Sequence, residues 1–269
     1  MGFRIGARCN TGLVATAHDD RVREQFRLQA TTFDNAGFAV RGLDWIIEQL
    51  APRRDDIALD VAAGAAHLGR ALAPLVSHVS AIDLTPEMLL QGQRLAEGAG
   101  LRNITFAVGD ATRLPWLDRQ FDLVVCRLAL HQVADPAAMV REMIRVTRPD
   151  GRIGITDMYV SAAEQAEANR LERLRDPSHN RTLTREEILA LVDESGAEVV
   201  SQAAADFDLD LDDWLERSRT PEEVRARIRS RLEQELDGGP ATGLAPSRLP
   251  DGRIRFVHPW VTVTATPRR

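Results

Sequence analysis

The sequence contains no lysine, so all 34 of its basic side chains are arginines. This absence excludes a Schiff-base lysine, a P-loop whose lysine holds phosphate, and a lysine general base. Cysteine is also scarce, because only Cys9 and Cys126 occur. Two cysteines build neither a disulfide framework nor a zinc framework, and we expect the protein to reside in the cytoplasm.

Long apolar runs and a surplus of positive charge are missing as well. No apolar run approaches the ~20 residues that span a bilayer, so we expect no membrane span. The formal net charge is −6, which argues against nucleic acid as a partner. Residues 1–18 lack the apolar centre of a signal peptide and the serine or threonine of a myristoylation signal. We expect them to form a flexible N-terminal arm.

From residue 57 onward, short apolar runs alternate with helical patterns. The region before them predicts two helices with apolar residues at helical spacing. The predicted strands are IALDVA, VSAIDL, NITFAVG, FDLVVCRLAL, GRIGITDMYV, AEVVSQAA and RIRFVHPWVTVTAT. Strands that alternate with helices form a mostly parallel sheet with helices on both faces, so the pattern predicts a doubly wound α/β fold.

The segment ALDVAAGAAHLGRAL, residues 58–72, is typical of a strand that leads through a turn of small residues into a helix. Such a turn suits a nucleotide, because small residues allow the backbone to approach a ligand and the helix N-terminus has free N–H groups. The G-x-G-x-x-G motif of dinucleotide sites is absent, however. The corresponding positions are Ala62, Gly64 and His67.

Two carboxylates indicate which kind of nucleotide fits. Asp60 ends the first predicted strand, where it would oppose a negative pyrophosphate and favour a ligand with a cationic group. Asp83 ends the second strand, 19 residues after Gly64, where an acidic residue can hold a pair of ribose hydroxyls. The two residues together favour a positively charged nucleoside over a nicotinamide dinucleotide.

Five segments, in this order and spacing, resemble the class I S-adenosylmethionine-dependent methyltransferases, and most closely their ubiquinone/menaquinone-type small-molecule branch. They are LDVAAGAAHLG, AIDLTPEML, VGDATRLPW, FDLVVCRLALHQVADP and VTRPDGRIGITD. Two later segments, RLERLRDPSHNR and DDWLERSRTPEEVR, resemble an uncharacterised bacterial subgroup. The resemblance covers roughly residues 20–266.

The resemblance implies a single methyltransferase domain over residues 19–269, with a seven-stranded Rossmann-like sheet whose last strand is antiparallel. Within it we expect N-terminal helices at 19–52, a cofactor-binding core at 53–160 and a C-terminal part at 161–269. A helical insert at about 205–250 should form a cap over the active site, together with the N-terminal helices. In this family such an insert selects the substrate.

The resemblance also implies S-adenosylmethionine as the cofactor, with S-adenosylhomocysteine as the product. Asp60 and the loop Ala62–Gly64 would face its amino acid part, whose ammonium group explains the carboxylate. Asp83 would accept both ribose hydroxyls. The other implied contacts are Leu84 and Met88 along the adenine, Gly109, Asp110 and Ala111 around its amino group and ring, and the backbone of Arg127 beside the methionine part. Structural alternatives are a helix cap for Asp83 and a turn cap for Asp110.

The loop departs from the family pattern D/E-x-G-x-G-x-G, because it reads D-x-A-x-G-x-A. Ala62 is a mild change and Ala66 a less usual one. If Ala66 required a positive φ, the affinity for the cofactor should fall, since its Cβ disfavours that conformation. We expect instead that Ala66 lies in the first turn of the helix, where alanine has no cost.

His131 follows the fourth strand, where methyl donor and acceptor should meet, and it is the candidate general base. The alternative is a histidine that only hydrogen-bonds the backbone or borders the cofactor, because many methyl transfers need little more than proximity. The spacing of His131, His179 and His258 in the sequence does not match a pattern of metal ligands, so it does not support a metal site built from them. Catechol-type methyltransferases have a magnesium ligand where this sequence reads Cys126-Arg127, so we predict no metal.

These patterns favour a metal-independent methyltransferase that acts on a small molecule. They leave open O, N or C acceptance and the oligomeric state, a homodimer included. One alternative is an enzyme that keeps the cofactor but catalyses a cyclisation or elimination, with the cofactor's charge acting electrostatically. A nicotinamide oxidoreductase is a second alternative, which Asp60 and the missing glycines oppose. A non-catalytic domain with a decayed loop is the third, and only Ala66 supports it.

Overall fold

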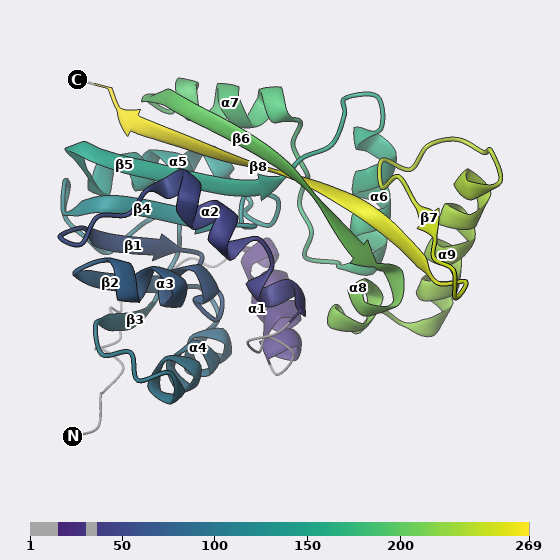
Figure 1. The fold of residues 1–269 in the computed structure, drawn as a ribbon, viewed down its shortest axis with the longest axis horizontal. Coiled ribbons are helices and arrows are strands. Elements are labelled where there is room, and N and C mark those ends of the chain that lie inside the picture. The colour runs from purple at the N-terminus through teal and green to yellow at the C-terminus, as the bar shows by residue number, and fades with distance from the viewer. Residues whose placement is uncertain (1–15, 31–36, 269) are drawn as a thin grey trace.

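The structure is a computed structural model, and it describes residues 16–30 and 37–268. Its centre is one mixed sheet with the strand order β3-β2-β1-β4-β5-β8-β6 (Figure 1). Neighbouring strands from β3 to β5 are parallel, and β8 is antiparallel to both of its neighbours. A two-residue strand, β7, pairs with β8 outside this order. The predicted doubly wound, mostly parallel sheet with an antiparallel last strand is confirmed, and β7 is an addition to it.

The elements follow the predicted alternation of strands and helices. The strands are β1 (Ile57–Val61), β2 (His78–Asp83), β3 (Ile104–Val108), β4 (Phe121–Arg127), β5 (Thr147–Met158), β6 (Ala197–Asp210), β7 (Ser247–Arg248) and β8 (Ile254–Pro267). The α-helices are α1 (Ala17–Gln29), α2 (Leu43–Leu50), α3 (His67–Leu72), α4 (Pro86–Gly98), α5 (Pro136–Val146), α6 (Gln165–Arg175), α7 (Arg185–Glu194), α8 (Leu211–Arg217) and α9 (Glu222–Leu236). Two 3₁₀-helices, η2 (Gly37–Val40) and η3 (Ala73–Leu75), precede α2 and follow α3.

Both faces of the sheet are covered, because successive side chains of its central strands point to opposite sides. Leu59 of β1 and Val124 of β4 pack into a core with α5 and α7. Ala58 and Leu123, their neighbours in sequence, pack into a second core with α2 and α3. Burial on both sides explains why these strands are almost continuously apolar. The sheet is therefore a rigid platform whose strand ends can carry a site.

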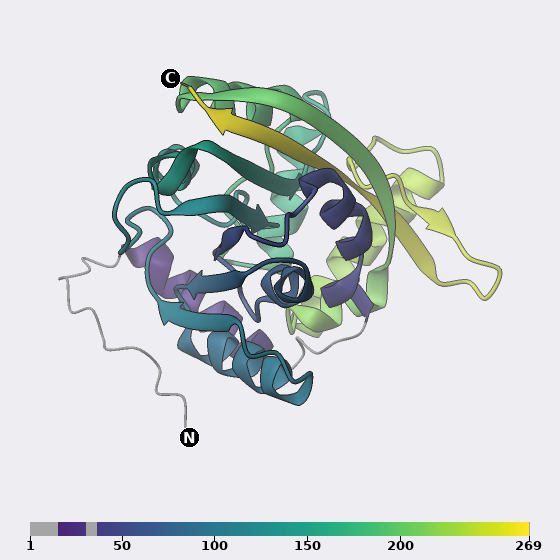
Figure 2. The same ribbon diagram turned by 60° about the vertical axis from the view of Figure 1, so that its left-hand side comes forward.

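Strands β6 and β8 run on past the parallel strands and carry a helical cap (Figures 1 and 2). Helices α6, α8 and α9 enclose a third core, in which the ring centroids of Trp214 and Phe256 lie 4.9 Å apart. The predicted insert at 205–250 begins too early, since β6 continues through Asp210 and pairs there with β8. Phe207 and Leu209 alternate with aspartates, which is the period of a strand.

Helix α1 links the core to the cap. It begins at Ala17, so residues 17 and 18 of the predicted arm belong to the helix, whereas residues up to 15 lie outside the described residues. His18 Nε2 donates to the carbonyl of Gln132 after β4 at 2.6 Å. Gln25 Nε2 donates to the carbonyl of Ser218 after α8 at 2.9 Å. Each end of the helix is thereby fixed to a different part of the molecule.

Candidate active site

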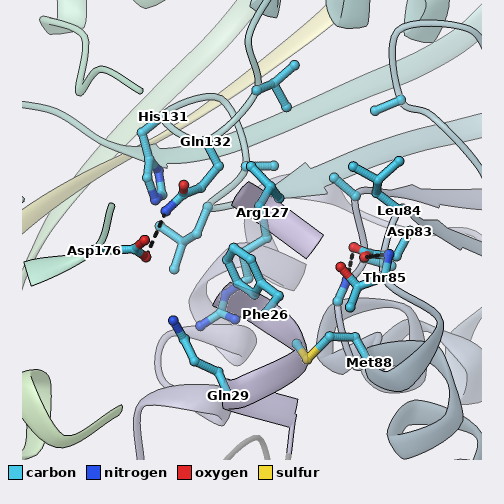
Figure 3. A pocket seen from close by; sticks show the side chains of 18 of the residues that line it. Phe26, Gln29, Asp83, Leu84, Thr85, Met88, Arg127, His131, Gln132 and Asp176 are labelled. Carbon is cyan, nitrogen blue, oxygen red and sulfur yellow. Dashed lines mark hydrogen bonds between the residues drawn. The ribbon is translucent and has the colours of Figure 1, made fainter. Parts of the chain in front are cut away.

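A cavity of about 490 Å³ lies at the carboxyl ends of the parallel strands, where ligands bind in open α/β sheets (Figure 3). Its walls come from the loops after β1 to β4, from α1 and from the cap. Every residue predicted for the site contributes to this lining: Asp60, Ala62, Gly64, Asp83, Leu84, Met88, Gly109, Asp110, Ala111, Arg127 and His131. The fold thus brings the predicted cofactor residues and the predicted base into one cavity.

Asp83 holds the cofactor loop and the start of α4 in place. Its Oδ2 accepts a hydrogen bond from the N–H of Gly64 at 2.7 Å, and its Oδ1 accepts from the N–H of Thr85 at 2.8 Å (Figure 3). Thr85 occupies the N-cap position of α4, but its side chain makes no capping hydrogen bond. Burial raises the pKa of Asp83, and these backbone donors oppose that rise. The carboxylate therefore shapes the loop besides facing the cavity.

Asp60 is a buried carboxylate at the end of β1, with 1% of its surface exposed. Its Oδ2 accepts from the N–H of Gly69 at 2.8 Å. Burial raises its pKa to about 7, although this hydrogen bond and the nearby charge of Arg127 act in the opposite direction. A Cβ at Gly69 would lie 2.9 Å from Asp60 Oδ2, so the close approach of α3 requires glycine there. The sequence prediction did not single out Gly69.

The loop after β1 turns through three residues in the left-handed region. Ala62 and Ala66 both have φ = 53°, and Gly64 has φ = 55°. The expectation that Ala66 lies in an ordinary first turn of α3 is wrong, because Ala66 is the left-handed N-cap of that helix. Its N–H donates to the carbonyl of Ala63 at 2.8 Å, which closes the tight turn. A Cβ on Gly64 would lie 3.1 Å from Met88 Cε.

The loops after β2 and β3 complete this end of the cavity. Met88 on α4 is fully buried, and Leu84 also lines the cavity. Asp110 Oδ1 accepts from the N–H and the hydroxyl of Thr112, at 2.8 and 2.7 Å. The turn cap that was the structural alternative for Asp110 is therefore present, while the residue also lines the cavity.

Arg127 has a structural role that its sequence position did not reveal. Its guanidinium donates to the carbonyls of Phe38, Ala39 and Arg41, at distances of 2.9 to 3.3 Å. These bonds fasten η2 to the end of β4. Burial lowers the pKa of Arg127 to about 10, and the carboxylate of Asp60 opposes this shift.

His131 lies in the loop after β4 and forms a dyad with Asp157, which is part of β5. Its Nδ1 lies 2.6 Å from Asp157 Oδ1, so an Nδ1–H donates to the carboxylate and leaves Nε2 without that proton. The N–H of Met158 also donates to Asp157 Oδ1, at 2.7 Å. Burial alone would lower the pKa of His131, but Asp157 raises it above its ordinary value. The dyad can therefore accept a proton from a molecule in the cavity.

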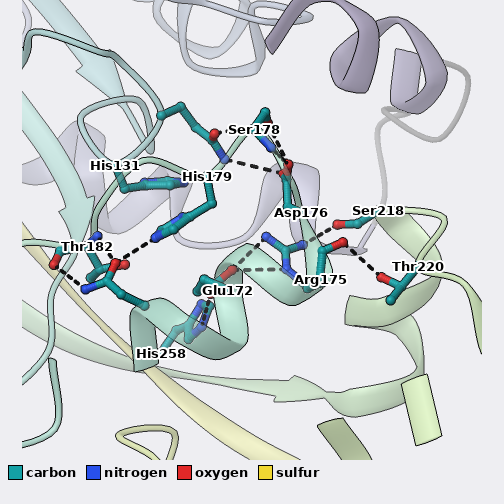
Figure 4. Close-up of polar contacts among 12 residues, drawn as sticks. His131, Glu172, Arg175, Asp176, Ser178, His179, Thr182, Ser218, Thr220 and His258 are labelled. Carbon is teal, nitrogen blue, oxygen red and sulfur yellow. Dashed lines mark hydrogen bonds and ion pairs between the residues drawn. The ribbon is translucent and has the colours of Figure 1, made fainter. Parts of the chain in front are cut away.

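Buried ion pairs form the end of the cavity beneath the cap (Figure 4). Arg175 Nη2 lies 2.9 Å from Glu172 Oε2, and the guanidinium also donates to the hydroxyl of Ser218. His258 Nε2 lies 3.4 Å from Glu172 Oε1. Burial alone would raise the pKa of Glu172, but Arg175 and His258 hold it well below its ordinary value. Glu172 is thus an ionised, paired carboxylate.

Comparison with known proteins identifies the family. The methyltransferase domain family matches residues 59–155. The uncharacterised methyltransferase YcgJ of Bacillus subtilis is 33% identical over 199 residues, which are 72% of this chain and 78% of the relative. The chain belongs to the class I S-adenosylmethionine-dependent methyltransferases. The crystal structure of a Bacillus halodurans methyltransferase described as putative superposes with a TM-score of 0.75 at 27% identity, covering 84% of this chain and 99% of that one.

A more distant relative shares only part of its length with the methyltransferase. The ubiquinone/menaquinone biosynthesis C-methyltransferase of Roseobacter denitrificans is 32% identical over 118 residues, 43% of this chain and 46% of the relative. The family assignment makes S-adenosylmethionine the cofactor, as predicted.

The methyltransferase has further cavity residues that the sequence prediction did not assign. They are Phe26 and Gln29 on α1, Glu172, Arg175 and Asp176 at the end of α6, and Arg217 on α8. The segment RLERLRDPSHNR was recognised as a family likeness, yet nothing in it indicated that Glu172 and Arg175 face inward. Of the tryptophans, Trp214 lines the cavity, whereas Trp116 packs on Phe121 with ring centroids 5.4 Å apart.

The three histidines considered for a metal site have other partners. His131 and His179 stack with ring centroids 5.7 Å apart, and His179 Nε2 bonds to Asn169 Oδ1 at 2.8 Å. Over residues 16–30 and 37–268, no group of three or more His, Cys, Asp or Glu side chains is placed to hold a metal ion. In those same ranges, no helix is both long and apolar enough to cross a membrane.

Proposed function

We propose that the methyltransferase transfers a methyl group to a small molecule without the help of a metal ion, with His131 as the general base. The observation that carries this proposal is the single cavity that joins the loop after β1 to the His131–Asp157 dyad. A cavity whose walls include α1 and the cap fits a small acceptor. The sequence-based expectation of a cytoplasmic location stays a prediction.

The loop end of the cavity fits the cofactor in three respects. Asp60 offers a buried carboxylate to an ammonium group, and Asp83 offers two oxygens to a pair of hydroxyls. Gly64 leaves a cradle that a Cβ would fill. The bound cofactor supplies an electrophilic methyl group on a sulfonium.

The dyad residues have separate tasks in the proposed transfer. His131 accepts the proton that leaves the nucleophilic atom of the acceptor as that atom bonds to the methyl carbon and the carbon–sulfur bond breaks. Asp157 is a positioning residue, because its hydrogen bond keeps the proton of the ring on Nδ1 and presents Nε2 as the acceptor. The relative from Roseobacter denitrificans is named a C-methyltransferase of ubiquinone/menaquinone biosynthesis. By analogy with that protein, the acceptor would be a cyclic or quinone-like molecule.

The test has a binding arm and a turnover arm. Calorimetric titration should give binding of S-adenosylmethionine and S-adenosylhomocysteine at about micromolar Kd, and none of NAD. A screen of small acceptors should then give S-adenosylhomocysteine at a rate that EDTA does not change. Cofactor binding with an altered acceptor but no S-adenosylhomocysteine would instead indicate the cyclisation or elimination chemistry. Failure to bind either sulfur ligand would contradict the proposal altogether.

A further inference from the structure

Arg217, at the end of α8, is a positive charge in the cavity wall that forms no ion pair with any described carboxylate. In the described part of the chain, its guanidinium has no hydrogen bond and no ion pair, and it lies over the ring of Phe38 at 3.9 Å from the centroid. The other two partly buried arginines of the wall are both engaged. Arg127 donates to three carbonyls, and Arg175 pairs with Glu172.

The charges around Arg217 do not neutralise it. Burial, and then repulsion by Arg175, lower the pKa of Arg217 to about 9. Asp213 attracts it from an exposed position, and Glu172 is already paired with Arg175. The only side-chain carboxylate outside the described residues belongs to Asp34. A desolvated cation of this kind is stabilised by an anion that enters the cavity.

The neighbouring indole offers a second unused donor. Trp214 lies one helical turn before Arg217, lines the same end of the cavity and is 1% exposed. Its buried Nε1 has no hydrogen-bond partner in the described ranges. Buried tryptophan N–H groups usually have an acceptor, so this one is available to a ligand oxygen.

The carboxylates at this end, in contrast, each have at least one oxygen with a partner. Asp157 holds His131, and Glu172 holds Arg175 with His258 nearby. Asp176 Oδ1 accepts from the N–H and the hydroxyl of Ser178, at 2.9 and 2.5 Å. One buried acceptor at this end, Oε1 of Glu172, has no hydrogen bond within the described ranges, and His258 Nε2 lies 3.4 Å from it. The charge of Glu172 is nevertheless paired with Arg175, so the uncompensated charge at this end is the positive one of Arg217, which favours an acidic ligand over an amine.

We infer that the methyl acceptor is an anion, whose carboxylate or phosphate group pairs with Arg217 and the indole N–H of Trp214 beneath the cap. The inference rests on the proposed function, because it assigns the substrate class of the same cavity. The nucleophilic atom of the acceptor would then lie between the Arg217–Trp214 pair and the loop end, where His131 lines the wall. Arg217 and Trp214 are binding residues in this account and take no part in proton transfer.

The experiment uses the full chain saturated with S-adenosylhomocysteine and four aryl probes: benzoate, phenyl phosphate, benzamide and benzylammonium. Calorimetry should show that at least one anionic probe binds about tenfold or more tightly than benzamide, since a charged hydrogen bond is lost in the amide. Benzoate and phenyl phosphate separate a carboxylate site from a phosphate site. Benzylammonium represents the competing amine acceptor.

Three variants locate the anion. Arg217→Gln should weaken the anionic probe about tenfold or more, and Trp214→Phe should weaken it severalfold because an aromatic ring is kept while the N–H donor is lost. Arg227→Gln is the matched control, because it removes an exposed arginine of α9 that does not line the cavity, and it should change nothing. All three should bind S-adenosylhomocysteine as the wild type does, which shows that the fold and the loop end are intact.

Two results would overturn the inference. One is a wild type that, with S-adenosylhomocysteine bound, binds no anionic probe up to about 20 mM, or binds benzamide or benzylammonium as tightly as the anions. The other is anion binding that appears only in Asp34→Asn, which would make Asp34 the counter-ion of Arg217. Neither result touches the methyltransferase assignment. Failure of S-adenosylhomocysteine itself to bind would contradict the proposed function, and the probes on the free chain would still decide the anion site.

Discussion

The two ends of the cavity are built in different ways. At the loop end, recognition depends on backbone: left-handed residues turn the chain, and Asp60 and Asp83 bond to backbone N–H groups of the same segments. At the cap end it depends on side chains such as Arg175 and Arg217, which come from helices far along the chain. The loop end, which recognises its ligand through the backbone, therefore suits a ligand that stays the same. At the cap end, substitution of side chains can change which ligand binds.

The largest expected effect concerns turnover, which requires both ends. His131→Gln should lower kcat by about 10³, and Asp157→Asn by about 10², because the first removes the base and the second its orientation. Since Asp157 raises the pKa of His131, the wild-type rate should rise with pH through a value above that of free histidine. Asp157→Asn should move this rise to lower pH. Rates of S-adenosylhomocysteine formation against pH measure both effects.

The dyad lies outside the loop after β1, so its variants should leave the loop end unchanged. We expect both variants to bind S-adenosylhomocysteine within about threefold of the wild type. An unchanged kcat in His131→Gln would show that proximity alone drives the transfer, as the alternative interpretation of this histidine holds.

The next largest effect concerns the loop end alone. Asp83→Ala should weaken S-adenosylhomocysteine by about 100-fold, because it removes charged acceptors for the ribose and frees the N–H groups of Gly64 and Thr85. Calorimetry on the variant measures the loss. Arg217→Gln serves as its control at the other end and should bind S-adenosylhomocysteine normally. If Asp83→Ala bound S-adenosylhomocysteine as tightly as the wild type does, the cofactor would not bind at the loop end.

A smaller effect links cofactor binding to pH through Asp60. With a pKa of about 7, this carboxyl is protonated below neutral pH and must ionise to pair with an ammonium group. Affinity for S-adenosylhomocysteine should rise up to about tenfold per pH unit below 7 and level off above it, with release of a proton. Calorimetry in buffers of different ionisation enthalpy detects that proton. Methylthioadenosine, which lacks the amino acid part, should show no such dependence.

The same pKa has a consequence for the stability of the free protein. Because the folded value lies above the ordinary 3.8, the contribution of Asp60 is fully present below pH 3.8 and is lost as the pH rises through about 7. Asp60→Asn should remove this part of the pH dependence of unfolding. If the affinity of the wild type for S-adenosylhomocysteine did not change with pH, the ammonium group of the ligand would not pair with Asp60.

The smallest effect is expected at Ala66. Its left-handed conformation costs about 1 kcal/mol, but glycine loses more backbone entropy and a buried methyl group, so Ala66→Gly should change stability by less than about 0.5 kcal/mol. The loop adopts this conformation with alanine in place, so affinity should change less than about threefold. Chemical denaturation and calorimetry measure the two quantities. A gain of tenfold or more would support the decayed-loop alternative.

The contrast between the two ends also explains what could be predicted from the sequence. The strands, the loop and Asp83 were predictable, because each is a local pattern in one contiguous segment. The left-handed φ of Ala66 was not, since alanine gives no local signal for it. Nor could spacing reveal that Arg175 lies over the ring of Trp214, or that Arg127 holds η2, because these contacts arise from tertiary packing.

The central claim is that one cavity receives the cofactor at the loop end and leaves the cap end for the acceptor. A crystal structure of the complex with S-adenosylhomocysteine tests it most directly. We predict the ribose hydroxyls at Asp83, the amino group beside Asp60, and His131 and Arg217 free of the ligand. S-adenosylhomocysteine bound among Arg175, Trp214 and Arg217, with the loop end empty, would contradict the account.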